Sequence, residues 1–254
     1  MIAIISPAKT QDFTNQGFID EYSEPAFLKE SEKLIKELRK KSAPKISKLM
    51  DVSSNIAELN YERYQNFKTP FTPENSKQAL LAFKGDVYTD IDVENFSKKE
   101  FNFAQDHLRI LSGLYGILKP LDLIQPYRLE MKIKLRNSRG KNLYEFWGNR
   151  ITDKINVDLE KTKNSYLINL ASNEYFKAID TKKIKAEIIT PVFKDNKNGE
   201  YKILAFYAKR ARGMMANFII KNKLQSVEKL KTFQEAGYEY SERLSTEKEW
   251  VFVR

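Results

Sequence analysis

Residues 109–131, RILSGLYGILKPLDLIQPYRLEM, place two glycines in an apolar run with positive charge around it. Gly113 and Gly116 stand three positions apart, and Arg109, Lys119 and Arg128 flank them. Backbone N–H groups at a glycine turn bind phosphate oxygens without side-chain clashes, and nearby cations add attraction. The stretch therefore predicts a helix-hairpin-helix-like phosphate cradle. The alternative is a tight turn in the core, because the apolar neighbours need burial and that motif usually spaces its glycines by two.

A second cationic group occurs near the end of the chain. Lys209, Arg210 and Arg212 fall within four residues, bracketed by Tyr207 and Gly213. We expect them at a strand-to-helix junction, where they would bind phosphate beside the first N–H groups of the helix. The alternative is a solvated run of charge.

Lys9 and Lys84 each follow a predicted buried strand, at residues 2–5 and 79–83. If these strands are neighbours, both ammonium groups line one cleft together with Asp86. Such a cleft would bind an anion or carry lysine–aspartate chemistry. The alternative is that all three are ordinary loop residues.

The elements that would position these groups alternate between strand and helix. Ser97 and Glu100 have the spacing of a capping box, and Asn198-Gly199 predicts a hairpin between strands 186–193 and 201–207. A further strand is expected at 166–170, with another helix beginning at 171–175 and short strands ending at 250–252. Other helices are expected at 24–41, closed by Pro44, at 53–67 and at 143–159. This order predicts a mixed α/β (α+β) fold: one compact domain over residues 1–254, with a mixed sheet flanked by helices.

Composition narrows the function. The 254 residues carry 44 Lys and Arg against 34 Asp and Glu, a net charge of +10, which favours a polyanionic partner. The chain has no cysteine and only His107 as histidine, which argues against thiol chemistry, iron–sulfur clusters and zinc sites. We therefore expect no metal and no cofactor. Without a basic leader or a long apolar stretch, we expect a cytoplasmic protein with no membrane contact.

Five blocks of the chain carry a resemblance: ISPAKT (5–10), AFKGDVY (82–88), LRILSGLYGILKPLDLIQPYRLEM (108–131), INLASNEYF (168–176) and FYAKRARG (206–213). With these blocks, the whole chain resembles the peroxide stress protein YaaA family, close to its enterobacterial members. The resemblance implies an α/β fold with a basic cleft and a helix-hairpin-helix-like element, here at 111–119. It also implies binding of duplex, bubble and branched DNA, protection from hydrogen peroxide, and an association with lower free iron. It supplies no catalytic residue.

Together these observations predict a DNA-binding protein of peroxide stress with little sequence specificity. The expected DNA contacts are Lys9, Lys84, Arg109, Gly113, Gly116, Lys119, Arg128, Lys209, Arg210 and Arg212. With so few soft ligands in the chain, we expect its effect on iron to be indirect. One alternative is an enzyme acting on a nucleotide or nucleic-acid base, with Lys9, Lys84 and Asp86 in the cleft. Another is a docking protein whose partners are recombination-repair proteins.

Overall fold

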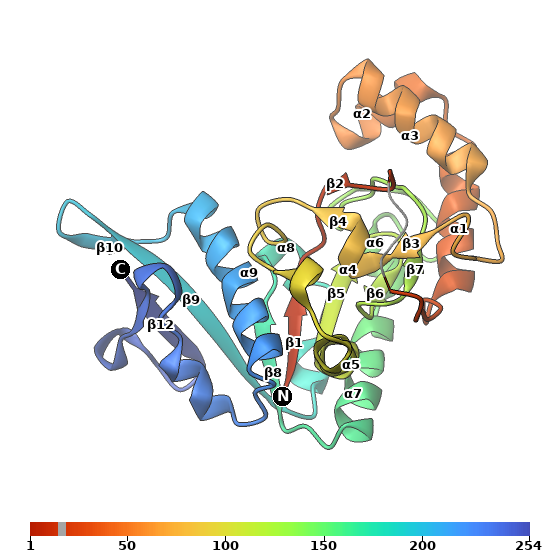
Figure 1. Cartoon of the computed structure of the whole chain (residues 1–254). Helices are drawn as coiled ribbons and strands as arrows, with labels where there is room; N and C mark the ends of the chain where they lie inside the picture. The colour runs from red at the N-terminus through yellow and green to blue at the C-terminus, as the bar shows by residue number, and fades with distance from the viewer. Residues whose placement is uncertain (15–18) are drawn as a thin grey trace.

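A computed structural model describes residues 1–14 and 19–254 of the protein. Within these residues, eight strands pair into the main sheet, which runs through the middle of the molecule (Figure 1). In sheet order the strands are β11 (Glu239–Tyr240), β12 (Glu249–Val253), β9 (Glu187–Lys197), β8 (Tyr166–Leu170), β1 (Ile2–Ile5), β5 (Leu108–Ser112) and β6 (Gly116–Leu118), with β10 (Glu200–Lys202) paired to β9. The pairs from β12 to β5 are parallel and the outer pairs are antiparallel, so the predicted mixed α/β fold is confirmed.

The central strands form because their residues are apolar on both faces. All four residues of β1 are buried, as are four of the five in β8, which is typical of parallel strands covered by helices. Helix α9 (Ala205–Lys221) packs against β1, β8 and β9, and α5 (Lys98–His107) packs against β1 and β5. Ser97 and Glu100 form the predicted capping box at the start of α5.

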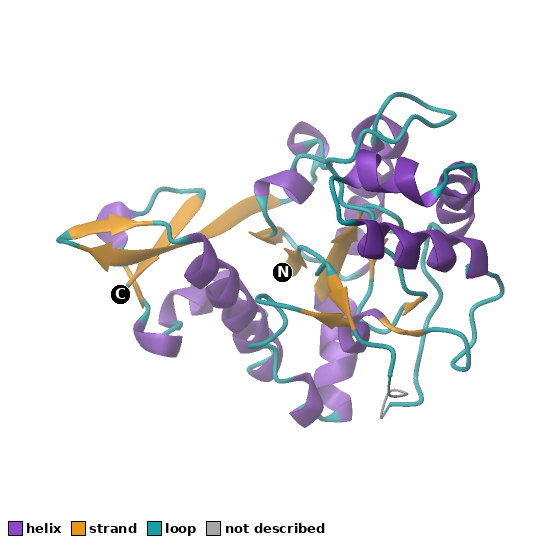
Figure 2. Cartoon of the chain, turned by 90° about the horizontal axis from the view of Figure 1, so that it is seen from above, coloured by secondary structure: helices purple, strands orange, loops and turns teal. Residues whose placement is uncertain are grey.

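Three helices gather at one end of the molecule (Figure 1): α1 (Leu28–Arg39), α2 (Ala43–Met50) and α3 (Ser54–Asn66). Figure 2 shows this helical group on the side opposite to β10 and the far end of β9. Arg39 ties α1 to the end of α3, since its Nε donates to the Tyr64 carbonyl at 2.8 Å. Pro44 does not close α1. It occupies the first turn of α2, where the backbone N–H that proline lacks would have no partner within the helix.

Several predicted elements differ in type or length. Residues 79–82 are not a strand but the short helix α4 (Ala79–Ala82), and only β4 (Phe83–Lys84) follows it. The helix predicted over 143–159 is two helices, α6 (Leu143–Trp147) and α7 (Arg150–Lys161), because Gly148 has a φ of +50° between them. The strand predicted over 201–207 ends early, and α9 begins at Ala205.

The remaining elements are short. Two small antiparallel pairs join β2 (Thr10–Gln11) to β4, and β3 (Lys77–Gln78) to β7 (Leu123–Ile124). The predicted helix after β8 is α8 (Asn173–Phe176). Short 3₁₀ helices occur at Val93–Asn95, Thr181–Lys183, Val227–Thr232, Glu235–Gly237 and Glu242–Leu244. Over residues 1–14 and 19–254, we find no helix with the length and apolarity to cross a bilayer.

The glycine-rich stretch is a β-hairpin and not a helix-hairpin-helix element. Strands β5 and β6 pair antiparallel, with Ser112 opposite Gly116, and every residue from 108 to 118 is buried. A Cβ at Gly113 would overlap the Leu129 carbonyl oxygen, and one at Gly116, where φ is +71°, would lie 2.7 Å from the Trp147 ring. The glycines are therefore required by close packing, and the phosphate-cradle prediction for them is wrong.

Candidate nucleic-acid interface

The carboxyl end of β1 is a topological switch point. Parallel neighbours lie on both sides of β1: β5 on one and β8 on the other. At such a point the loops that follow the strands diverge and leave room for a ligand. The loop after β1, Ser6 to Lys9, and the short loop after β8, Ala171 and Ser172, both lie at this end of the sheet.

These two loops are fixed to each other by hydroxyl groups. The Ser172 N–H donates to the Ser6 Oγ at 2.9 Å, and the two Oγ atoms are 3.2 Å apart. From the other side, the buried Tyr88 hydroxyl donates to the Ser6 carbonyl at 2.9 Å. Lys9 therefore emerges from a loop with a fixed base.

A cavity of about 420 Å³ opens beside Lys9. Its charged lining consists of Lys9, Arg128, Lys132 and Lys134 with Asp51 and Glu130, a net charge of +2. The Glu130 carboxylate is 8% exposed and lies 3.4 Å from the Lys9 Nζ and 3.3 Å from an Arg128 Nη. One buried carboxylate thus orients two cations, and the cavity keeps its positive excess. Below, these four cations with Glu130 are called the Lys9 cluster.

Tyrosines close the inner end of the Lys9 cluster. Tyr127 and Tyr175 border a water-sized space of about 10 Å³ that also touches Lys9 and Glu130. The Tyr127 hydroxyl is 2.6 Å from the Ser112 Oγ. Burial raises the pKa of both phenols well above 10, so they remain protonated and uncharged at neutral pH.

Two cations of the Lys9 cluster, Lys132 and Lys134, belong to an exposed run that continues along the chain to Arg136. Lys132, Lys134 and Arg136 are exposed and alternate with buried apolar residues at 131, 133 and 135. Within the described part of the chain, none of the three forms an ion pair, so their charge is not neutralised locally. We call them the basic row. The predicted site did not include Lys132, Lys134 and Arg136, although their two-residue alternation with apolar residues was the signal for one exposed cationic edge.

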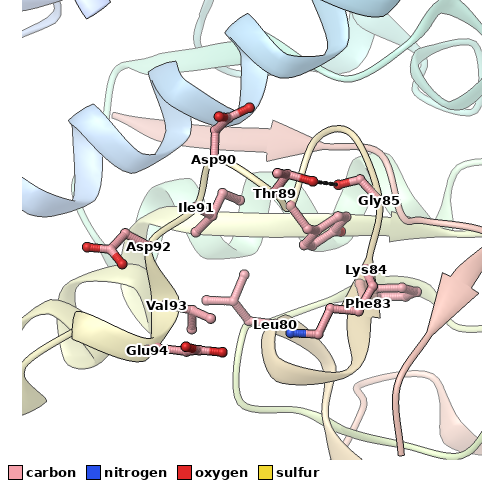
Figure 3. Close-up of a pocket in the computed structure, with 11 residues that line it drawn as sticks. Leu80, Phe83, Lys84, Gly85, Thr89, Asp90, Ile91, Asp92, Val93 and Glu94 are labelled. Carbon is pink, nitrogen blue, oxygen red and sulfur yellow. Dashed lines mark hydrogen bonds between the residues drawn. The ribbon is translucent and has the colours of Figure 1, made fainter.

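Lys84 does not share the Lys9 cavity. Their loops do adjoin, because Thr10 pairs with Lys84 between β2 and β4. The Lys84 side chain, however, lines a separate pocket of about 380 Å³ with Asp90, Asp92 and Glu94 (Figure 3). That pocket has an acidic excess. The expectation of a shared lysine cleft is therefore wrong for Lys84.

The cations of α9 are more neutralised than predicted. They lie inside the helix and not at its junction with a strand. Lys209 Nζ donates to Asp86 at 3.1 Å, and Arg210 makes two bonds to Asp90, at 2.7 and 2.9 Å. The Arg212 guanidinium forms no hydrogen bond or ion pair with any described residue, and burial lowers its pKa.

Arg109 is a structural residue. Its side chain is 3% exposed and donates to the Asp158 carboxylate at 2.6 Å, so the structure contradicts its predicted DNA contact. Lys119 lines a small cavity of about 160 Å³ with Arg109, and burial lowers the pKa of its ammonium. Both lie apart from the Lys9 cluster. Of the ten predicted contacts, only Lys9 and Arg128 belong to the Lys9 cluster, whereas Arg109 and Lys119 share the smaller cavity.

The single imidazole takes part in packing. His107 stacks on Phe103 with ring centroids 4.1 Å apart, and its Nδ1 is 2.8 Å from the Met1 carbonyl oxygen. Among the described residues, no three or more His, Asp or Glu side chains gather as a metal ion would require.

Comparison with known proteins adds to this picture. A sequence model of the family described as "Peroxide stress protein YaaA" matches residues 1–244. A relative described as "UPF0246 protein" from Colwellia psychrerythraea (strain 34H / ATCC BAA-681) is 53% identical over 254 residues, covering 100% of this chain and 99% of the relative. Another of the same description from Cellvibrio japonicus (strain Ueda107) is 52% identical, covering 100% of this chain and 98% of the relative.

Proposed function

Because this chain belongs to the peroxide stress protein YaaA family, we propose that it binds DNA with little sequence specificity and so protects it from oxidative damage. One observation carries the proposal: the basic row, Lys132, Lys134 and Arg136, is exposed, free of ion pairs within the described residues, and continuous with the Lys9 cluster. Unpaired lysine and arginine side chains attract phosphates by releasing condensed counterions, and such contacts carry no base information.

Several cations elsewhere on the molecule are already paired with carboxylates, which favours the basic row as the interface. Arg109, Lys209 and Arg210 each already hold a carboxylate, so a phosphate would have to displace it. The basic row has no such competitor. A chain of net charge +10 also attracts DNA over a longer range, and salt weakens that attraction.

The test is a salt titration of binding to a labelled DNA duplex, measured by fluorescence anisotropy. Each neutralised phosphate contributes about 0.9 to the slope of log K against log salt. Replacing the basic row, as K132Q/K134Q/R136Q, should lower that slope by about 2 to 3 and weaken binding to all sequences alike.

A matched control separates the proposed edge from net charge alone. Lys161, Lys163 and Lys185 are also exposed and form no ion pair within the described residues, and they lie away from the Lys9 cluster. Their triple change to Gln removes the same charge but should leave the slope within about 1 of wild type. Equal losses in both triples, or no binding of wild type at low salt, would contradict the proposal.

The effect on iron is proposed to be indirect, because the chain has no cysteine and the ring of its one histidine is engaged in packing. Titration of the purified protein with Fe²⁺ tests this. Tight stoichiometric binding would refute it.

A second candidate function is catalysis on a nucleotide or a nucleic-acid base. The cavity of the Lys9 cluster favours it, since it lies at a switch point and has the size of a small-ligand site. Incubation with nucleotides and with DNA, followed by chromatography, tests it. Turnover that is lost in Lys9→Met would establish catalysis, whereas DNA recovered unchanged supports binding alone.

A further inference from the structure

Residues 201–207 expose an unusual density of apolar side chains. Tyr201, Ile203, Phe206 and Tyr207 are 39%, 57%, 54% and 42% exposed, respectively. Single exposed apolar residues are ordinary, but four within seven residues concentrate apolar surface in the way that marks a binding surface. We call these four residues, three aromatic and one isoleucine, the aromatic patch. It lies where β10 ends and α9 begins, at the side of the molecule away from α1 to α3 (Figures 1 and 2).

The rings of the aromatic patch have a supported geometry. The Phe206 and Tyr207 centroids are 5.5 Å apart at an interplanar angle of 69°. The Arg254 guanidinium lies 4.8 Å from the Tyr207 centroid and 4.5 Å from that of buried Tyr238. Arg254 also bonds to the Asp195 carboxylate at 2.5 Å, so Tyr207 rests on an anchored group. Phe206 is supported by Tyr207 and remains more than half exposed.

The charge around the aromatic patch indicates what covers it. Residues 194–212 contain six cations and two carboxylates, a net charge of +4. Counting Asp86 and Asp90, which pair with Lys209 and Arg210, still leaves +2. An occupant that suits both features is a polyanion with flat apolar groups. In a closed duplex the faces of the bases are stacked and inaccessible, but unpaired bases offer them.

We propose that the aromatic patch stacks unpaired bases, so that the protein distinguishes opened DNA from closed duplex. This inference rests on the proposed DNA binding and adds a second contact area, chemically different from the basic row. Stacking on an aromatic side chain tolerates every base, because each base has a π-face. The preference it gives is therefore for strand opening and not for sequence.

Phe206→Ala is the test variant, since the ring is exposed and its one ring–ring contact among the described residues is Tyr207. Affinities for a labelled duplex, the same duplex with a central bubble, and a single strand are compared at one salt concentration. Stacking contributes about 1–3 kcal/mol per base, so bubble and single-strand binding should weaken by about fivefold or more while duplex binding stays within about twofold. Val157→Ala on α7, 56% exposed, is the matched control and should change neither.

Phe206→Trp provides a fluorescence signal that would not respond to bubble DNA if residue 206 had a purely structural role. It should retain the preference for opened DNA, and its added indole fluorescence should be quenched by the bubble and not by the duplex. Circular dichroism confirms that each variant is folded.

The outcomes separate the inference from the function beneath it. If wild type binds DNA but Phe206→Ala keeps the bubble-to-duplex ratio, stacking is wrong and DNA binding stands. Equal loss on duplex and bubble also overturns stacking. If wild type is a dimer by sedimentation and Phe206→Ala makes it a monomer, the patch is a contact between copies and the inference fails. If wild type binds no DNA at low salt, the proposed function itself fails.

Discussion

The buried pair Arg109–Asp158 yields a prediction whose size follows from its contacts. Arg109 donates to the Asp158 carboxylate at 2.6 Å and to the carbonyls of Gln105 and Leu108 at 2.9 and 2.7 Å. Both charged side chains are 3% exposed. Arg109→Met removes all three bonds and leaves Asp158 with Lys154 as its remaining cation. Breaking a buried pair costs about 3–5 kcal/mol, a large part of the 5–15 kcal/mol that holds a typical domain folded.

The assay is urea denaturation followed by circular dichroism, with DNA affinity measured on the folded protein. We expect Arg109→Met to lose about 3–5 kcal/mol of unfolding free energy with DNA affinity within about twofold of wild type. The double change Arg109→Met/Asp158→Leu should recover part of the loss, because no buried charge is left alone and Lys154 reaches water.

The same pair predicts a pH dependence. Burial alone would raise the pKa of Asp158, but Arg109 and Lys154 more than offset this and hold it below its ordinary 3.8. Its stabilising contribution is therefore present above about pH 4 and lost as the pH falls through the lowered value.

A variant Arg109→Met that stays within about 1 kcal/mol of wild type and loses DNA binding would refute the structural role assigned to Arg109.

Three more predictions follow from local geometry. Gly113→Ala should cost about 3 kcal/mol in a thermal melt, because its Cβ would overlap the Leu129 carbonyl oxygen, while the remaining folded protein binds DNA normally. Burial raises the pKa of Asp122 to about 6, so the folded state binds this proton more tightly than the unfolded chain does. The free energy of unfolding should therefore fall by about 3 kcal/mol as the pH rises from about 4 to 6. Asp122→Asn should remove this pH dependence. Ser97→Ala should cost about 1 kcal/mol in urea denaturation, since it removes the hydroxyl that caps α5, whereas Ser97→Thr keeps most of it.

Local patterns predicted much of the fold. The apolar runs at 2–5 and 166–170 are strands, the Ser97 capping box opens a helix, and the Asn198-Gly199 turn joins β9 to β10. Each of these signals depends on neighbours within a few residues. The strand predicted over residues 79–82 was wrong for the complementary reason. A short apolar run is equally typical of a buried strand and of a buried helix, so tertiary packing decides between them.

The candidate site was harder to predict, because ion pairs join distant segments. Nothing near Arg109 in the sequence reveals that Asp158 lies beside it, and the partners of Lys209 and Arg210 are more than 100 residues away. The glycine pair misled in the same way: the groups that require it, Leu129 and Trp147, lie outside the motif. Counting cations therefore overestimates the charge available to a ligand, and only the structure separates neutralised cations from free ones.

The position of β12 at the end of the chain has a consequence for synthesis on the ribosome. Thr190 to Lys194 of β9 pair with β12, while β8 reaches only as far as Ile189. Until residues 249–253 have emerged, this apolar stretch has no strand to complete it and offers an open template to other nascent chains. A transcript cut short by a few codons should therefore yield aggregates and proteolysis in place of a slightly smaller working protein.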